Sequence, residues 1–250
     1  METAISSRIV RRLIPTNMRG TAHWPQGVVS FTFDDFPKSA LIAGGAVLER
    51  HGVRGTYYAA CSLAGRSDDP WPLFDADDLH EAHERGHEIG CHTNTHLDCA
   101  AANSRLLRAE IRANAKSLAP IVGEYGLASF AYPFGRTSKV ARRVLGNRFA
   151  SCRGIQPGIN AGVPDYVELR ANKIYMSQFD KEKIKELIER NRTVGGWLIF
   201  YTHDVSDLPS PYGCTEAQLE CVVDYATARS TVLRMRDVVS TLAPHRVIGG

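Results

Sequence analysis

Short apolar runs alternate along the chain with segments whose apolar residues recur every three or four positions. The short runs are typical of buried strands, and the longer period is typical of helices that pack one face on a sheet. The predicted strands are Val28–Phe33, Thr56–Ala60, Glu88–Cys91, Ser129–Tyr132, Trp197–Tyr201 and Thr231–Leu233. The predicted helices are Ala40–His51, Asp75–Arg85, Ser104–Ala119, Lys139–Leu145, Lys181–Asn191 and Thr215–Arg229.

Several predicted helices begin after a residue whose side-chain oxygen can bind the free backbone N–H groups of the first turn. These N-cap residues are Asp75, Asn103, Asp180 and Thr215. Asp78 stands three residues after Asp75, which is the spacing of a capping box. Strands that alternate with helices in this way predict an α/β fold with a parallel sheet, either open or closed into a barrel.

The sequence of 250 residues contains no internal repeat and no long polar linker. We therefore expect a single domain over residues 27–250, after an N-terminal extension of residues 1–26. The extension carries apolar residues on one helical face beside Arg8, Arg11 and Arg12. Such an amphipathic helix either packs on the domain as a lid or makes peripheral contact with an anionic membrane surface.

Composition narrows the class of protein further. Hydrophobic residues make up 44% of the chain and charged residues 23%, which excludes a disordered chain. The formal net charge is +3 with scattered basic residues, so we expect no nucleic-acid partner. The six cysteines form no CxxC pair, which favours buried thiols in a reducing compartment over a disulfide framework. There is no apolar stretch of about 18 residues and no signal-peptide pattern, so we expect a cytoplasmic protein without a transmembrane segment.

The chemistry of parallel α/β folds gathers beyond the carboxyl ends of the strands. Asp34 and Asp35 follow the first predicted strand. Because the side chains of neighbouring residues diverge, one carboxylate can bind a metal while the other contacts water or substrate. The alternative is that the two acids open a turn or cap the next helix.

Histidines follow two other predicted strands. His92 and His96 are four residues apart and can converge on one ion, and with one carboxylate they leave coordination positions open for water and substrate. His203 follows the most apolar strand. Imidazole titrates near neutrality, so His203 is suited to act as a general acid or base. The alternative for His203 is a structural hydrogen bond to Asp204 or another carboxylate.

Four motifs, in this order along the chain, resemble those of the polysaccharide deacetylase family (the NodB homology domain, carbohydrate esterase family four). Thr32–Pro37 reads TFDDFP and is similar to the family's TFDDGP, with Phe36 where glycine is usual. His92–His96 matches H[ST]xxH, and Phe130–Gly135 resembles FRPPYG. Leu198–Asp204 resembles the family's closing motif, in which a histidine follows an apolar strand.

The resemblance covers most of the chain and implies a distorted (β/α) barrel of about seven or eight strands. It also implies one divalent metal ion, most often zinc, with cobalt or nickel as alternatives. The metal ligands that it implies are Asp35, His92 and His96. By the same resemblance, Asp34 is the general base that takes a proton from metal-bound water. His203 is the general acid that protonates the leaving amine.

Further residues are expected to contact the substrate. The resemblance implies that the backbone N–H of Phe134 helps to hold the oxyanion, with Tyr132 in the same motif beside it. Tyr212 lies in a segment rich in turn residues. It either stacks on a sugar ring or belongs to an ordinary surface loop.

The sequence also departs from the family's pattern. Ala131 stands where many members carry an arginine that pairs with the base. Arg170 or Lys173, in the strand-like stretch Tyr166–Ile174, is the predicted replacement. No segment matches the family's fourth motif, whose aspartate orients the acid histidine. Asp204 should point away from its neighbour in the sequence, which leaves the group that orients His203 unassigned.

These features predict a metal-dependent hydrolase that removes an N-acetyl group from an amino sugar during glycan or polysaccharide assembly. The expected substrate is a nucleotide-linked sugar, a lipid-linked precursor or a short oligosaccharide. One alternative keeps the fold and the metal but cleaves an O-acetyl ester, a formamide or another non-peptide C–N bond. A second alternative is a non-catalytic sugar-binding module.

Overall fold

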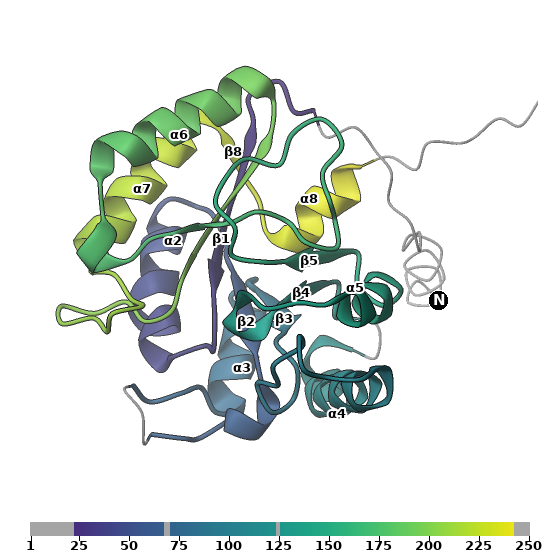
Figure 1. The fold of residues 1–250 in the computed structure, drawn as a ribbon. Coiled ribbons are helices and arrows are strands. Elements are labelled where there is room, and N and C mark those ends of the chain that lie inside the picture. Colours follow the sequence, from purple (N-terminus) through teal and green to yellow (C-terminus); the bar gives the residue numbers. More distant parts are fainter. Residues whose placement is uncertain (1–22, 68–70, 124–125, 243–250) are drawn as a thin grey trace, which may run out of the picture.

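The computed structural model describes residues 23–67, 71–123 and 126–242. Its centre is one eight-stranded sheet in which every pairing is parallel, shown with its surrounding helices in Figure 1. The strands are β1 (Val28–Phe33), β2 (Thr56–Ala59), β3 (Glu88–Cys91), β4 (Ser129–Ala131), β5 (Ser151–Arg153), β6 (Asn172–Lys173), β7 (Trp197–Thr202) and β8 (Thr231–Val232). Their order is β5-β4-β3-β2-β1-β7-β6, and β8 pairs with β1.

The sheet is strongly curled, and one segment joins its two edges. In that segment Leu169 pairs with Arg153 of β5, while Asn172 and Lys173 pair with β7. The peptide N–H of Cys152 also donates to the carbonyl of Tyr166. This arrangement is the distorted (β/α) barrel that the sequence predicts. All the carboxyl ends of the strands therefore meet around one opening.

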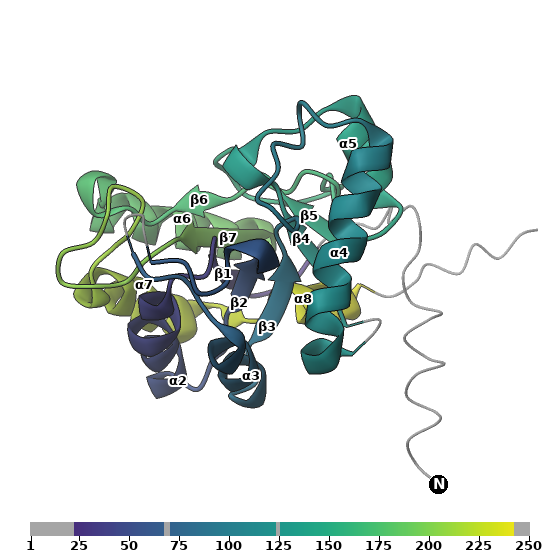
Figure 2. The same cartoon turned by 90° about the horizontal axis from the view of Figure 1, so that it is seen from below.

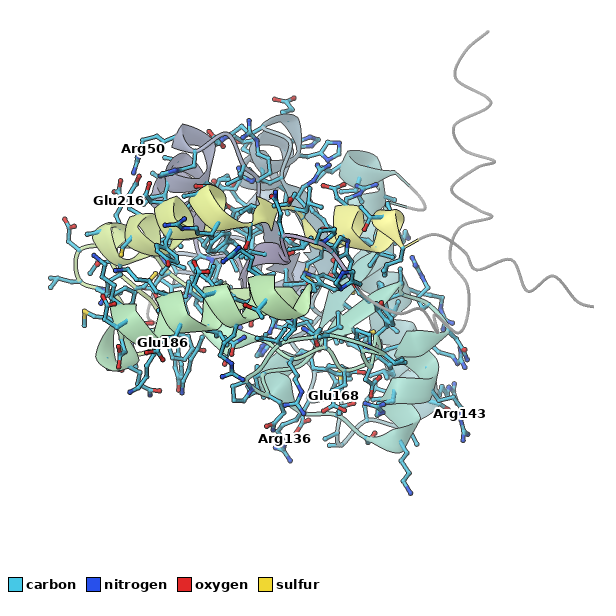
Figure 3. The ribbon with its side chains drawn as sticks, turned by 90° about the horizontal axis from the view of Figure 1, so that it is seen from above. Arg50, Arg136, Arg143, Glu168, Glu186 and Glu216 are labelled. Atoms are coloured by element: carbon cyan, nitrogen blue, oxygen red, sulfur yellow. The ribbon has the colours of Figure 1, made fainter. Side chains whose placement is uncertain are left out.

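Helices cover the outside of the curled sheet. They are α2 (Ala46–Arg50), α3 (Ala76–Glu84), α4 (Ser104–Val122), α5 (Lys139–Gly146), α6 (Lys181–Val194) and α7 (Glu216–Arg229). The last helix, α8 (Met235–Thr241), instead packs Met235 and Val238 against the residues inside the barrel. Figure 2 shows α4 running along the side of the barrel next to β3 and β4. On the side formed by α2 and α7, Arg50 lies 2.8 Å from Glu216, and both side chains are labelled in Figure 3.

Most predicted elements are present with small changes at their ends. The capping box of Asp75 and Asp78 forms as predicted, and Asn103, Asp180 and Thr215 cap their helices. The helix predicted from Ala40 begins instead as a π-helical stretch, Ala40–Gly45, before α2. Among the strands and α-helices of the described residues, β5 and α8 were not predicted. In the strand-like stretch Tyr166–Ile174, the part from Tyr166 to Glu168 is a turn, Leu169 makes one isolated bridge, and only Asn172–Lys173 forms a strand.

Two apolar layers hold the barrel together. The larger lies between the sheet and the helices, and the smaller fills the barrel interior around Trp197, Ile199 and Met235. The six cysteines are free thiols, four of them buried, as predicted for small apolar residues. Among the described residues, no helix is long and apolar enough to span a bilayer. The first 22 residues, which hold the predicted amphipathic extension, lie outside the described part of the chain.

One buried amide ties α4 to the ends of two strands. Asn114 is fully buried and accepts a hydrogen bond from the N–H of Cys61 at 2.9 Å. Its own NH₂ group donates to the carbonyl of Ala59 at 3.0 Å and contacts Cys91 Sγ at 3.3 Å. These backbone groups lie at the end of β2, where the carbonyl of Ala59 also accepts the N–H of His92 at 3.2 Å. Asn114 therefore satisfies them and holds the edge of the opening in place.

A buried histidine precedes β3 at the opposite end of the barrel. Nδ1 of His87 accepts a hydrogen bond from the N–H of Gly55 at 3.1 Å, and Nε2 lies 2.8 Å from a carboxylate oxygen of Glu49. Burial lowers the pKa of His87 to about 4, although the contact with Glu49 opposes this effect. A second proton, on Nδ1, would also break the hydrogen bond to Gly55. The native fold therefore keeps His87 neutral.

We predict that His87 makes the fold less stable in mild acid. Below about pH 6.5 the unfolded chain protonates this histidine while the native protein does not, so the free energy of unfolding falls as the pH falls toward 4, by up to about 3 kcal/mol. Urea denaturation between pH 7 and pH 4 would show a smaller pH dependence in His87→Gln than in the wild type. His80→Gln, at an exposed position on α3, is the control. An unchanged pH dependence in His87→Gln would contradict this assignment.

Candidate active site

Three predicted ligands meet at the carboxyl ends of β1 and β3. Oδ1 of Asp35 lies 3.4 Å from Nε2 of His92 and 3.2 Å from Nε2 of His96. One ligand atom from each of these residues lies within 4.8 Å of the others. The three side chains thus form a compact group of one carboxylate and two imidazoles.

The spacing of these atoms fits a shared divalent ion. Two ligands about 2.1 Å from a metal, separated by 90° to 110°, lie about 3.0–3.4 Å apart. Oδ1 of Asp35 is buried without a hydrogen-bond partner, which is costly unless a cation satisfies it. Nδ1 of His92 lies 2.8 Å from the carbonyl of Ala131. A proton shared with that carbonyl leaves Nε2 of His92 free to ligate.

Charges within the group favour ligand binding. Burial raises the pKa of the Asp35 carboxyl, but contact with His92 and the charges of the nearby histidines lower it more, so the net pKa is well below its ordinary value. Burial and the neighbouring His92 lower the pKa of His96 to about 4. At neutral pH, Asp35 is therefore ionised and His96 has a free lone pair.

The backbone around the site is strained. Among the described residues, every non-glycine with positive φ lies next to this group: Asp35, Phe36, Thr93, His96 and Phe134. Such backbone conformations cost free energy and persist only when the surroundings hold them. Phe36, where the family usually has glycine, has a φ of 51° and is fully buried against Tyr57 and Phe74. Burial of this ring offsets the strain.

Arg153 of β5 is the cation that pairs with Asp34. The guanidinium is fully buried and donates from Nη2 to Oδ1 of Asp34. Its Nη1 donates to the carbonyl of Gly154 at 3.0 Å. Its carbon Cζ lies 5.2 Å from the ring centre of Tyr58 and 5.0 Å from that of Tyr201. These contacts hold Asp34 in one orientation, as a motif arginine would.

The prediction that Arg170 or Lys173 supplies this cation is wrong. Arg170 is exposed and donates to the carbonyl of Pro157 at 3.0 Å. Lys173 lies over the ring of Tyr175, with Nζ 5.6 Å from the ring centre. Sequence analysis missed Arg153 because β5 is short and has no apolar pattern. The feature that could have revealed Arg153 is an arginine where a short strand ends, although that strand was not detected.

His203 lies on the other side of Asp35. Its Nε2 is 3.8 Å from Oδ2 of Asp35, so it faces the same opening as the ligand group. The rings of Trp71, Tyr175 and Tyr212 lie 5.9, 6.1 and 5.6 Å from the imidazole, measured between ring centres. The aromatic wall beside His203 is therefore assembled from three separate loops, and Tyr212 is 54% exposed in it.

Asp204 does not orient His203 directly. Both oxygens of its carboxylate accept hydrogen bonds from Ser210. Nδ1 of His203 instead lies 3.3 Å from the carbonyl oxygen of Tyr212. The group that orients the histidine is thus a backbone carbonyl of the same loop.

Phe134 and Tyr132 differ in what they offer a substrate. Phe134 has a φ of 58°, is 59% exposed and packs its ring edge-on against His96 at 4.4 Å. Tyr132 is buried, and its hydroxyl donates to the carbonyl of Val167 at 2.8 Å. The predicted place of the Tyr132 side chain at the substrate is therefore wrong, because the ring belongs to the core.

Comparisons with solved structures show the same fold. A putative polysaccharide deacetylase from Mycobacterium smegmatis has a TM-score of 0.61 at 16% identity, with 92% of this chain and 98% of that chain covered. A deacetylase from Streptococcus pyogenes, solved with acetate, has a TM-score of 0.57 at 17% identity over 73% and 77% of the two chains. A family 4 acetyl xylan esterase from Clostridium thermocellum, solved with a cobalt ion, has a TM-score of 0.56 at 17% identity over 86% and 91%.

Sequence comparison identifies the family. No curated protein matches the chain. The family model described as polysaccharide deacetylase matches residues 22–148, slightly more than half of the sequence. This range contains Asp34, Asp35 and both histidines of the ligand group. The chain therefore belongs to the polysaccharide deacetylase family.

Proposed function

We propose that the protein is a metal-dependent hydrolase that removes an N-acetyl group from an amino sugar of a glycan or polysaccharide precursor. One observation carries the proposal: a buried acid held by an arginine, a three-residue ligand group and a histidine all face one opening. These are the parts that amide hydrolysis needs, namely a base, an electrophilic centre and an acid.

Asp35, His92 and His96 would hold the ion, with zinc, cobalt and nickel all compatible with this ligand set. When bound, such an ion polarises the acyl carbonyl and lowers the pKa of a water molecule toward neutrality. The orphaned Oδ1 of Asp35 and the free Nε2 of His92 support this assignment.

Asp34 serves as the general base in this proposal. It accepts the proton of the attacking water while the Arg153 guanidinium holds its carboxylate in place. The pair is almost completely buried, so bulk water does not compete for the carboxylate. The N–H of Phe134, the central residue of the turn Pro133–Gly135, is the proposed donor to the oxyanion.

His203 serves as the general acid. An amine leaves slowly unless it is protonated, and the imidazole lies beside Asp35 at the opening. If the Nδ1–H donates to the carbonyl of Tyr212, the neutral tautomer directs Nε2 toward the scissile bond, where it takes up and delivers the proton. Tyr212 and Trp71 beside the imidazole are the proposed contacts for the sugar ring.

We predict that substituting a single ligand abolishes ion binding. Asp35→Asn should weaken Co²⁺ binding at least about a hundredfold, because the negative ligand at the centre of the group is lost. Visible absorption during Co²⁺ titration of metal-free protein, followed by competition with Zn²⁺, measures this affinity. Asp98→Asn is the matched control, since that carboxylate pairs with Arg136 at 2.9 Å outside the group. Equal affinities in Asp35→Asn and the wild type would rule out this site.

We also predict acetate release from an N-acetylated sugar by the zinc-loaded protein. Asp34→Asn should lower kcat about 10²- to 10⁴-fold, because no base remains to accept the proton of the water. The test panel contains N-acetylated, O-acetylated and N-formylated sugars, free and nucleotide-linked. Asp207→Asn, in an exposed loop position, is the control.

Each outcome of the panel has a distinct meaning. Release only from an ester or a formamide would keep the site but overturn the proposed substrate. No release from any compound, with the ion shown to be bound, would favour a non-catalytic sugar-binding protein.

A further inference from the structure

The loop after β7 is built around a carboxylate that pairs with no described cation. Asp204 is 4% exposed, and its Oδ2 and Oδ1 accept hydrogen bonds from the N–H and the hydroxyl of Ser210 at 2.8 and 2.7 Å. The Ser210 Oγ in turn accepts the N–H of Tyr212 at 3.0 Å. The carboxylate thus sets the conformation of the chain that leads to Tyr212.

The carbonyl of Tyr212 is where this loop meets the site. It lies 3.2 Å from the peptide N–H of His203, 3.3 Å from His203 Nδ1 and 3.3 Å from the hydroxyl of Thr202. A Cβ on Gly213 would come within 2.1 Å of Asp204 Oδ1, so only glycine allows this close return of the chain. The loop therefore has one packed arrangement, with a single acceptor directed at His203.

We propose that Asp204 and Ser210 are positioning residues for His203. Acting through the Tyr212 carbonyl, they hold the proton on Nδ1 and direct Nε2 toward the opening. The role rests on the proposed function, in which His203 is the acid. In this proposal the carbonyl of Tyr212 orients the histidine, which the resemblance implies for an aspartate in other members of the family. Asp204 acts indirectly, because it shapes the loop that holds this carbonyl.

Kinetics on two kinds of substrate separate positioning from general structural damage. Ser210→Ala and Asp204→Ala should lower kcat for the N-acetyl sugar about tenfold or more, with little change in KM. Hydrolysis of 4-nitrophenyl acetate should change less than about twofold, because nitrophenolate leaves without a proton. Ser206→Ala, in the same loop, is the control. Equal losses on both substrates would overturn the proposal.

A spectroscopic measurement tests the loop even if the proposed reaction is wrong. Long-range ¹H–¹⁵N spectra of the full chain report which nitrogen of each neutral imidazole carries the proton, and His203→Gln identifies the signals of His203. The wild type should show an Nδ1-protonated ring, and Ser210→Ala a shifted or mixed one. Unchanged His203 signals in Ser210→Ala and Asp204→Ala would overturn the positioning role.

A second, independent observation concerns the outer face of α4. Four cations lie along it at a spacing that places them in one row about 16 Å long: Arg105, Arg108, Arg112 and Lys116. Lys139 and Arg143 of α5 are also exposed, and Figure 3 shows Arg143 at the outer edge of the molecule. Within the described chain, none of these six side chains has an acidic partner.

The row has no compensating acid on its own helix. Glu110, the only acid of α4, is turned inward and accepts the N–H groups of Asn94 and Thr95 at 2.9 and 2.8 Å. The face formed by α4 and α5 therefore carries a local excess of exposed positive charge.

An apolar row runs beside the cations. Leu106 is 43% exposed, and Ala109 and Ala113 continue the row along the helix. Val140 of α5 is also 43% exposed. Small aliphatic groups offer nothing to a sugar or a nucleic acid, but next to cations they suit the boundary between lipid headgroups and acyl chains.

We infer that the α4–α5 face docks on an anionic phospholipid bilayer. Vesicle sedimentation of the full chain tests this, with phosphatidylcholine vesicles that contain or lack about one third phosphatidylglycerol. Replacing Arg105, Arg108, Arg112 and Lys116 by Gln should weaken binding at least about tenfold. The matched control replaces Lys181, Lys183, Arg190 and Arg192 of α6 by Gln, which removes the same charge from another exposed helix.

The outcomes separate the sources of binding. Selective loss in the α4 variant, and none in the α6 variant, supports the docking face. Equal loss in both variants would mean a non-specific charge effect and would overturn it. Full binding by the α4 variant would place the membrane contact elsewhere. Binding to soluble heparin without binding to vesicles would identify an anionic polymer as the ligand, and would also overturn the bilayer.

Discussion

The buried ion pair between Arg153 and Asp34 is the interaction on which the rest of the site depends. Burying a guanidinium costs several kcal/mol unless its charge and its donors are satisfied. Here the carbonyl of Gly154 and Asp34 accept N–H groups from Nη1 and Nη2, and two tyrosine rings lie against the guanidinium. Its buried Nε has no hydrogen-bond partner among the described residues. Asp34 follows β1 while Arg153 ends β5, with three strands between them in the sheet order, so the pair forms only when the sheet curls. The ion pair thereby links the curvature of the barrel to the orientation of the acid.

Strain at the strand ends is the second constraint. Positive φ at Asp35 and His96 turns these side chains toward one point, and the cost is met by well-packed neighbours such as Phe36. Backbone conformations of this kind persist where the surrounding structure determines them fully. The ligand group is thus prearranged, and the buried, unpaired Oδ1 of Asp35 is a consequence of that arrangement.

Two polar contacts of the site are made by residues outside the family's sequence motifs: the cation beside Asp34 and the acceptor beside Nδ1 of His203. An arginine from β5 pairs with Asp34, the contact for which the resemblance in sequence implies an arginine at the position of Ala131. A backbone carbonyl contacts Nδ1 of His203, and a buried aspartate one residue away shapes the loop that presents it.

The sequence by itself determined most of the strands, the helix caps and, with the family resemblance, the residues of the ligand group. Those features depend on local patterns, and parallel strands bring their carboxyl ends together in any curled sheet. It did not reveal Arg153, because β5 is too short to show a pattern and its side chain must cross the barrel to reach Asp34. It also misplaced Tyr132, whose ring turns into the core. Only the tertiary structure decided these contacts, since they depend on how far the sheet curls and on how each loop returns to it.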